Sequence, residues 1–308
     1  MKLLTKVKEN TIAKEMSLKA RDIDVCLYNI IDGSLPKEFI LDALMIYENK
    51  DGGFGNDLYI DNYNPNSSVF QVYEAFRIIY IAGFSSKDKN ELYDSIINHA
   101  ANYLYNRIEP DGLFWNPNTI ENNNYAHSDI FEYNDKNKKL FGMHPTLAIL
   151  GYTLLFFKET KAYYKKAYSM SLKLINYYLN NNNPTKYELI SVDSFLNSIK
   201  NIKLFDEYKD KLENKLAIDA LNNLSMIFDD DKLHPLDIIY LKNDKLDEYR
   251  DIELDYLVDS IASFGLWDYK KGWNNGGIYA EEDSAMIKWI GANSVNNYYL
   301  LKYFGRIE

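Results

Sequence analysis

The stretch Asn49-Lys50-Asp51-Gly52-Gly53-Phe54-Gly55 decides the fold prediction, because a similar stretch recurs later in the chain. The second copy reads Glu109-Pro110-Asp111-Gly112-Leu113-Phe114-Trp115. Each copy follows a helical segment and consists of Asp-Gly, one or two small or apolar residues, and an aromatic residue. The two Asp-Gly pairs, at 51 and 111, lie 60 positions apart. A fixed period of about two helices with their loops is typical of stacked helical hairpins.

The glycines of this motif predict a sharp turn after each helix. Glycine adopts positive φ angles without steric cost, and we expect such a conformation at Gly53. The aromatic residue then fills the space between neighbouring hairpins. Weaker copies of the pattern occur at residues 264–268 and 273–277. Repeated hairpins of this kind either extend as a solenoid or close into a ring.

Apolar residues recur at helical spacing along nearly the whole chain, which predicts an all-α protein. The segment 68–82 is the clearest case, because Ser68 and Gln71 form a capping box and Gly83 stands at the exit. We expect ten to twelve helices in a single domain of residues 1–308; the rival is two helical domains divided at residues 181–185. Beyond the helix at 68–82 and one near the N-terminus, helices are predicted near residues 37–48, 88–106, 145–159, 161–180, 187–200, 207–228, 233–241, 250–263 and 283–304.

Composition excludes several classes of protein. With 35 Lys+Arg against 45 Asp+Glu the net charge is -10, which argues against a nucleic-acid partner. The longest apolar run, 147–157, is far shorter than the ~20 residues of a membrane helix, so no spanning segment is expected. The basic start has no apolar leader core, and we expect a cytoplasmic protein. One cysteine, Cys26, and four scattered histidines predict neither a metal site nor a cofactor.

With these turns and helix pairs the chain resembles the α/α-toroid superfamily of terpenoid cyclases and protein prenyltransferase β-subunits, most of all its small bacterial members. The resemblance rests on residues 51–55, on residues 111–115, and on the rhythm of helix pairs over nearly the whole chain. It implies an inner and an outer ring of helices around a central cavity. It also implies a cavity lined by aromatic side chains that binds an apolar or isoprenoid ligand.

The sequence departs from the catalytic motifs of that superfamily. Zinc prenyltransferases use an aspartate, a cysteine two positions later and a distant histidine, and only Asp24 before Cys26 fits, outside the expected turn. The Asp-x-Asp-Asp run of proton-initiated cyclases is absent. The acidic cluster at residues 229–231 lacks the spacing that binds magnesium diphosphate, and we interpret it as a solvated helix end.

A long polar loop, residues 56–67, joins the first glycine-rich turn to the capped helix. Loops this long usually have a functional task. In a ring of helices this loop would lie at a cavity mouth, and we expect Asp57 and Asp61 to point inward as candidate acids. Burial among aromatic rings raises the pKa of a carboxyl group, which suits it to donate a proton. The alternative is a capping network that only shapes the loop. Candidate ligand-binding side chains on this loop are Asn62, Asn64 and Asn66.

A second polar loop runs from Trp115 to Asp129. His127 and Asp129 are candidates for a catalytic base and the carboxylate that orients it. The alternative for His127 is an ordinary hydrogen-bonded or solvated loop histidine. We add three aromatic side chains to the candidate ligand-binding set: Trp115, Tyr125 and Trp267.

Three functions fit these residues. The first is a terpenoid-cyclase-like or prenyltransferase-like protein with a small-molecule, isoprenoid ligand and acid catalysis from Asp57 or Asp61. The second is a carbohydrate-active α/α-barrel hydrolase or lyase in which Asp61 and Asp129 flank a glycosidic bond. The many tyrosine, asparagine and aspartate side chains suit a sugar ligand somewhat better than an isoprenoid. The third is a binding or scaffold module without catalysis.

Overall fold

The structure, a computed structural model, describes residues 1–110, 112–228, 232–274 and 277–308. Within these ranges the regular structure is helical, with isolated β-bridges and no named strand, which confirms the all-α prediction. The α-helices are α1 Lys6–Lys19, α2 Asp22–Asp32, α3 Phe39–Met45, α4 Val69–Ile81, α5 Glu91–Asn106, α6 Asp135–Phe141, α7 Thr146–Phe156, α8 Ala162–Asn180, α9 Lys186–Ile199, α10 Asp206–Asn223, α11 Asp244–Asp259 and α12 Glu281–Tyr303. The short 3₁₀ helices are η1 Ile120–Asn124, η2 Asp129–Phe131, η3 Lys203–Phe205 and η4 Pro235–Asp237.

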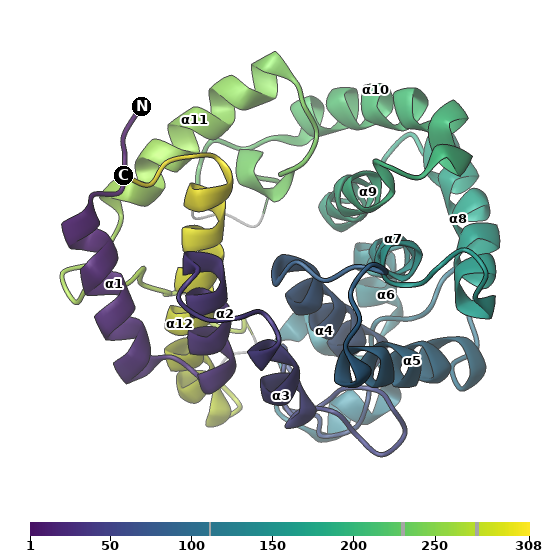
Figure 1. The fold of residues 1–308 in the computed structure, drawn as a ribbon, viewed down its shortest axis with the longest axis horizontal. Helices are drawn as coiled ribbons and strands as arrows, with labels where there is room; N and C mark the ends of the chain where they lie inside the picture. Colours follow the sequence, from purple (N-terminus) through teal and green to yellow (C-terminus); the bar gives the residue numbers. More distant parts are fainter. Residues whose placement is uncertain (111, 229–231, 275–276) are drawn as a thin grey trace.

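The helices form a peripheral set and a central set (Figure 1). Helices α1, α5, α8, α10 and α11 lie at the edge of the view, whereas α2, α4, α7, α9 and α12 lie nearer the middle. Central helices contact one another in the pairs α2 with α12, α4 with α7, and α7 with α9. Each of α1, α8, α10 and α11 contacts at least one of the central helices. The central helices therefore lie between the peripheral helices and the middle of the molecule.

Residues at or just before the starts of several central helices line the same cavity. Ile23 and Phe70 are the second residues of α2 and α4, Tyr187 is the second residue of α9, and His144 stands just before α7. All four line one cavity. The N-terminal turns of these helices therefore converge on this cavity.

The start of α4 is capped as the sequence predicts, with one difference. Ser68 Oγ accepts the backbone N–H of Gln71 at 3.2 Å. The Gln71 side chain does not complete the capping box; it accepts the N–H of Tyr59 at 2.7 Å and donates to the carbonyl of Asn62 at 3.3 Å. Gln71 therefore anchors the polar loop to the first turn of α4, and Gly83 follows the helix with φ 88°.

The expected helix at 233–241 is wrong, because only the single turn η4 forms there. Asp193 on α9 accepts the backbone N–H groups of the three consecutive residues 239–241 at 2.7 to 3.2 Å. Arg250 on α11 donates to backbone carbonyl groups of the same segment. These side chains take the place of helical hydrogen bonds, and α11 begins earlier than predicted, with Asn243 as its cap.

The glycine-rich turn corrects a second expectation. Gly52 has the positive φ, 86°, and Gly53 does not. Gly53 is required for close packing instead, since a Cβ atom there would lie 2.5 Å from the Cβ of Ser67. Asp51 holds the turn by accepting the N–H of Gly53 at 2.9 Å and the hydroxyl of Ser67 at 2.7 Å. In the second copy of the motif Gly112 has φ 76°, whereas Asp111 lies outside the described residues.

One cluster of buried apolar side chains extends along the chain from Leu4 to Leu301 and includes residues on both sides of the 181–185 break. The two ends of the chain meet, because the N–H of Leu4 donates to the carbonyl of Arg306 at 2.7 Å and the N–H of Glu308 donates to Leu4 at 3.1 Å. The acidic cluster at 229–231 lies outside the described residues.

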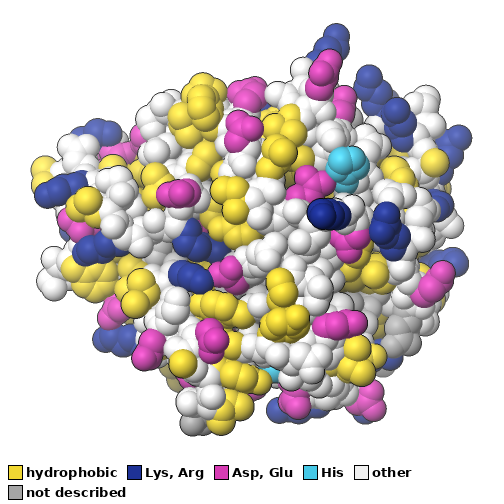
Figure 2. Space-filling model, turned by 90° about the horizontal axis from the view of Figure 1, so that it is seen from below, with side chains coloured by type: hydrophobic (Ala, Val, Ile, Leu, Met, Phe, Trp, Pro, Cys, Tyr) yellow, Lys and Arg dark blue, Asp and Glu magenta, His cyan; other side chains and the backbone are white. Residues whose placement is uncertain are grey.

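Surface charges of both signs are interspersed with scattered apolar side chains on the face shown in Figure 2. Among the helices that the structure describes, none combines the length and the apolar character needed to cross a bilayer.

Candidate functional site

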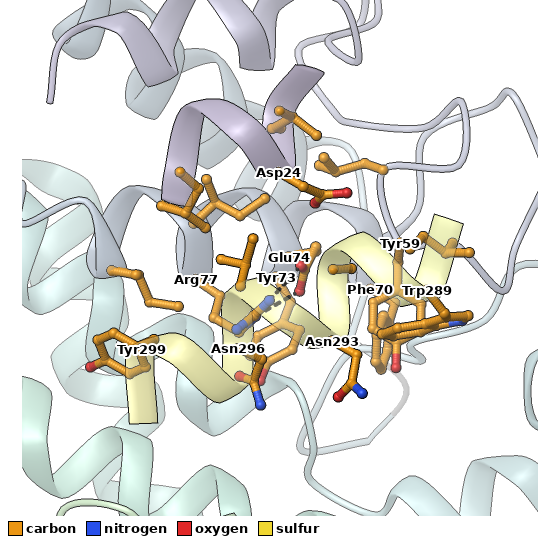
Figure 3. A pocket seen from close by; sticks show the side chains of 18 of the residues that line it. Asp24, Tyr59, Phe70, Tyr73, Glu74, Arg77, Trp289, Asn293, Asn296 and Tyr299 are labelled. Carbon is orange, nitrogen blue, oxygen red and sulfur yellow. Dashed lines mark hydrogen bonds and ion pairs between the residues drawn. The ribbon is translucent and has the colours of Figure 1, made fainter. Parts of the chain in front are cut away.

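A cavity of about 290 Å³, which we call the central cavity, lies between α2, α4 and α12 (Figure 3). One part of its wall is apolar and aromatic, with Phe70 and Tyr73 from α4. The rest is polar, and Figure 3 shows Asn293 and Asn296 of α12 on the side opposite α2. The polar side chains lining the cavity include Arg21, Asp24, Glu74, Arg77, His144, Asp237, Asn293, Asn296 and Tyr299.

Two ion pairs stand in this wall. Arg77 donates from Nε and Nη2 to the two carboxylate oxygens of Glu74, each at 2.8 Å. Arg21 donates to both oxygens of Asp24 at 2.8 and 2.9 Å, and its Nη1 donates to the backbone of the polar loop. Bidentate pairing keeps charged groups in a buried site at a tolerable cost. The cavity wall is therefore polar as well as aromatic.

His144 adds a neutral polar group to the same wall. Complete burial lowers the pKa of its imidazole to about 3, so it is uncharged near neutral pH. Its Nδ1 lies 3.1 Å from the hydroxyl of Ser191, and its ring packs against Tyr73 at a centroid distance of 4.9 Å. His144 can therefore exchange hydrogen bonds with a ligand but cannot offer it a positive charge.

A second pocket, of about 330 Å³, adjoins the central cavity, and we call it the Asp61 pocket. Three aromatic residues line both spaces, namely Tyr59, Tyr187 and Trp289. Two candidate acids from different loops, Asp61 and Asp129, line the pocket together. The other described residues that line it are Ser128, Ile130, Leu140, Lys186, Tyr269, Lys271, Gly272, Trp273 and Asn274.

Asp61 has a buried carboxyl group whose two oxygens differ in their hydrogen bonds. Its Oδ1 accepts the indole N–H groups of Trp289 at 2.6 Å and Trp273 at 2.7 Å. Among the described residues none donates a hydrogen bond to Oδ2. Burial raises the pKa of Asp61, the two indole hydrogen bonds partly oppose this, and the net shift is upward. A raised pKa and an unbonded oxygen are the properties of a carboxyl group that can give up a proton to a ligand.

Asp129 is held by its backbone while its side chain stays available. It is the first residue of η2, its N–H donates to the carbonyl of Trp273 at 3.2 Å, and its carbonyl accepts from Asn137 at 2.6 Å. Its half-buried carboxylate forms no hydrogen bond or ion pair with any described residue. The charge of Asp129 contributes to raising the pKa of Asp61, which places the two carboxyl groups within electrostatic range of each other.

Stacked aromatic rings form the wall beside Asp61. Tyr269 lies parallel to Trp289, with ring centroids 5.1 Å apart and an interplanar angle of 17°. Tyr59 meets Trp289 edge to face at 5.5 Å. Burial raises the pKa of Tyr187, which faces both spaces, to about 12, so its hydroxyl is a neutral donor and acceptor. Such rings offer flat apolar surfaces with polar groups at their edges.

The other predicted acid, Asp57, lies in an ion pair outside the Asp61 pocket. Lys288 Nζ of α12 donates to Asp57 Oδ2 at 2.6 Å and to the hydroxyl of Tyr63 at 3.0 Å. Asp57 has φ 52°, and its neighbour Asn56 also has a positive φ. The contacts of Asp57 therefore fix the shape of the loop and its attachment to α12.

The three candidate asparagines belong to a hydrogen-bond network with Asn122 of η1. Asn62 and Asn64 are buried and donate from their side chains to Asn122 Oδ1 at 3.3 and 2.9 Å. Asn66 is exposed and donates to Asn64 Oδ1. None of the three lines the central cavity or the Asp61 pocket. The network joins the two polar loops and thereby helps to position Asp61 near Asp129.

His127 lies beside the Asp61 pocket but outside its lining. Its Nδ1 is 2.7 Å from the backbone carbonyl of Tyr125, and its ring packs against Tyr279. Tyr125 itself is exposed. Of the predicted pair His127 and Asp129, it is Asp129 that lines the pocket.

The two remaining candidates are buried tryptophans outside the Asp61 pocket. Trp115 packs edge to face against Tyr105 at 5.1 Å. Trp267 donates its indole N–H to the carbonyl of Leu257 at 2.8 Å, and it lines a separate surface pocket that also includes Glu253. Ligand binding by either tryptophan stays a prediction.

Sequence reasoning missed the most specific partners of Asp61. Trp273 lies in one of the weaker copies of the turn motif, and Trp289 lies on the C-terminal helix. Both tryptophans can be seen in the sequence, but the sequence does not show which residues their indoles contact. The Glu74 and Arg77 pair was also missed, although opposite charges three residues apart on an otherwise apolar helix are a readable signal. Within the described ranges no group of three His, Cys, Asp or Glu side chains is arranged to hold a metal ion.

No protein-family model matches this chain, and comparison with curated proteins and with solved structures gives no significant match.

Proposed function

We propose that this protein is a glycoside hydrolase that binds a sugar chain across the Asp61 pocket and the central cavity. The observation that carries the proposal is that Asp61 and Asp129, from two different loops, line one pocket with aromatic walls. Glycoside hydrolysis commonly uses two carboxyl groups, one protonated and one ionised. The raised pKa of Asp61 suits it to the protonated role. The available carboxylate of Asp129 suits the ionised role.

In the proposed reaction Asp61 donates its proton from Oδ2 to the glycosidic oxygen, and the bond from that oxygen to the anomeric carbon breaks. A water molecule adds to the anomeric carbon, and the Asp129 carboxylate accepts a proton from that water. The indole N–H groups of Trp273 and Trp289 then stabilise the negative charge left on Asp61. Proton exchange with solvent restores both groups.

The polarity of the cavity favours a sugar over an isoprenoid ligand. Its wall carries the Arg77 and Glu74 pair together with Asn293 and Asn296, which match a ligand with many hydroxyl groups. An isoprenoid in the same space would separate these polar groups from water without satisfying them, which is unfavourable. The aromatic platform of Tyr269 and Trp289 suits the apolar face of a sugar ring.

We also propose that the helices form the α/α toroid that the sequence resembles. The peripheral and central sets of helices in Figure 1 support this arrangement. So does the convergence of the N-terminal turns of α2, α4 and α9 on one cavity. The central cavity is then the middle of the ring.

Soluble oligosaccharides of glucose, xylose, mannose and N-acetylglucosamine are the direct test, with release of reducing ends and thermal stabilisation as readouts. We expect Asp61→Asn and Asp129→Asn each to lower hydrolysis by about 10² or more. Asp210→Asn, on the exposed face of α10, is the control and should leave hydrolysis unchanged. Stabilisation by farnesyl diphosphate but by none of the sugars would favour the isoprenoid alternative. Sugar binding without hydrolysis would favour a non-catalytic binding module.

A further inference from the structure

A pocket of about 530 Å³ lies away from the site described above, and we call it the lysine-rimmed pocket. It lies where α4, α7 and α9 end, between residues 85–87, 157–159 and 197–202. None of its described lining residues also lines the central cavity or the Asp61 pocket. The proposed hydrolase site makes no use of it.

The floor of this pocket is apolar. Its side chains come from the end of α7, from the loop after α7 and from the segment after α9, namely Leu154, Leu155, Phe157 and Ile202. Tyr164, at the start of α8, also lines the pocket and is only 4% exposed. The Tyr164 hydroxyl has no hydrogen-bond partner within the described structure. A buried hydroxyl without a partner is costly, and a bound acceptor atom would remove that cost.

Three exposed lysines surround the floor: Lys87, Lys158 and Lys200. In the described part of the chain none of their ammonium groups forms an ion pair with a carboxylate. Among the described lining residues Glu159 is the one acidic side chain, so the described part of the rim is net positive on a chain of net charge -10. Lysine near the end of a helix is favourable by itself, because the helix dipole is negative there. That effect explains neither the apolar floor nor the unpartnered Tyr164 hydroxyl.

We propose that the lysine-rimmed pocket binds an amphipathic anion, a molecule with an apolar chain and a carboxylate or phosphate head. The apolar chain covers Leu154, Leu155 and Phe157, and the head lies among the lysines. A polar atom of the same ligand accepts the hydrogen bond of Tyr164. A fatty acid and an alkyl phosphate share this chemistry, and binding measurements distinguish them.

Calorimetric titration with octanoate, octyl phosphate, octanol and inorganic phosphate tests the proposal on the full chain. We expect the two amphipathic anions to bind at least tenfold more tightly than octanol, and inorganic phosphate alone not to bind. Going from hexanoate to decanoate should tighten binding about two- to fourfold per methylene group, as burial of a CH₂ predicts. Tighter binding of the octyl phosphate would identify a phosphorylated ligand, and tighter binding of octanoate a fatty acid.

Variants locate the binding. The triple change Lys87→Gln, Lys158→Gln and Lys200→Gln should weaken octanoate binding at least tenfold, whereas Lys14→Gln on α1, also exposed, should not. Tyr164→Phe should weaken it severalfold while leaving the unliganded protein at least as stable. The proposal is overturned if the anions bind no better than octanol, or if the triple variant and Lys14→Gln behave alike. It is overturned equally if Tyr164→Phe folds normally and binds with unchanged affinity.

Discussion

Asp61 Oδ1 accepts a hydrogen bond of 2.6 Å from the indole nitrogen of Trp289, which joins the polar loop before α4 to the C-terminal helix. The two residues are 228 positions apart in the chain. The same indole ring lines the central cavity and the Asp61 pocket. Movement of α12 therefore changes the position of the candidate acid and the wall of both spaces together.

Replacing Asp61 by Asn separates its chemical role from its structural one. The amide oxygen still accepts from both indoles, and the amide is uncharged like the protonated carboxyl group that it replaces. We expect the free energy of unfolding at pH 7 to change by less than about 1 kcal/mol or to rise, and hydrolysis to fall by about 10² or more. Thermal melts and reducing-end assays measure the two effects. An early melting Asp61→Asn protein with full activity would contradict the assignment.

Asp57→Asn is expected to behave differently although it lies on the same loop. Its ion pair with Lys288 is partly exposed, and pairs of this kind contribute about 0 to 1 kcal/mol. We expect a small loss of stability that shrinks at high salt, with turnover and ligand affinity nearly unchanged. Melting temperatures at low and high sodium chloride concentration, together with the hydrolysis assay, check this. A hundredfold loss of turnover would instead make Asp57 the acid.

The buried carboxyl group of Glu253 should make the stability of the fold depend on pH. Burial raises its pKa to about 8 from the ordinary value of 4.5; the Leu236 N–H that it accepts opposes the shift, and the nearby Asp237 charge adds to it. Between these two pH values the folded protein binds the proton more tightly than the unfolded chain. The free energy of unfolding therefore falls as pH rises through this window.

Glu253→Gln should flatten that dependence, because glutamine stays neutral and still accepts the Leu236 N–H. Melting curves from pH 5 to pH 9 should show the variant several degrees more stable than the natural protein at the upper end. Glu213→Gln, at an exposed position of α10, serves as the control. Parallel pH profiles for the natural protein and Glu253→Gln would show that Glu253 does not hold its proton in the folded state.

Substitutions at two glycines separate the cost of a steric clash from the cost of backbone strain. Gly53→Ala places a Cβ against Ser67 without a strained φ, whereas Gly83→Ala has open space but φ 88°. Because the Gly53 contact of 2.5 Å requires the turn to move, we expect a loss of several kcal/mol there. At Gly83 the loss should be about 1 kcal/mol. Chemical denaturation measures both, and equal losses would mean that the turn yields more easily than its contacts indicate.

Much of the fold was predictable because its signals are local. The cap at Ser68 and the exit at Gly83 lie within one helix length of each other, and the structure has both. The failure at 233–241 has a non-local cause, since Asp193 and Arg250 hold that backbone from other helices. Periodicity alone cannot show a side chain that replaces helical hydrogen bonds.

The site was predictable in part for the same reason. Asp61 and Asp129 stood out because acidic residues in long polar loops are visible in the sequence, and the structure brings both to one pocket. Their surroundings were not visible, because Trp273 meets Asp61 across 212 positions of the chain. The contacts that set the pKa of Asp61 therefore cannot be predicted from the spacing of residues in the sequence.

The pairing of Leu4 with the segment around Arg306 and Ile307 has a consequence for how the chain can be rearranged. Because these segments lie side by side, a short glycine-rich linker can join them, and new ends can be opened in the loop at 181–184 between α8 and α9. Such a circular permutant keeps every helix and every contact of the Asp61 pocket while reversing the order in which the two halves are synthesised.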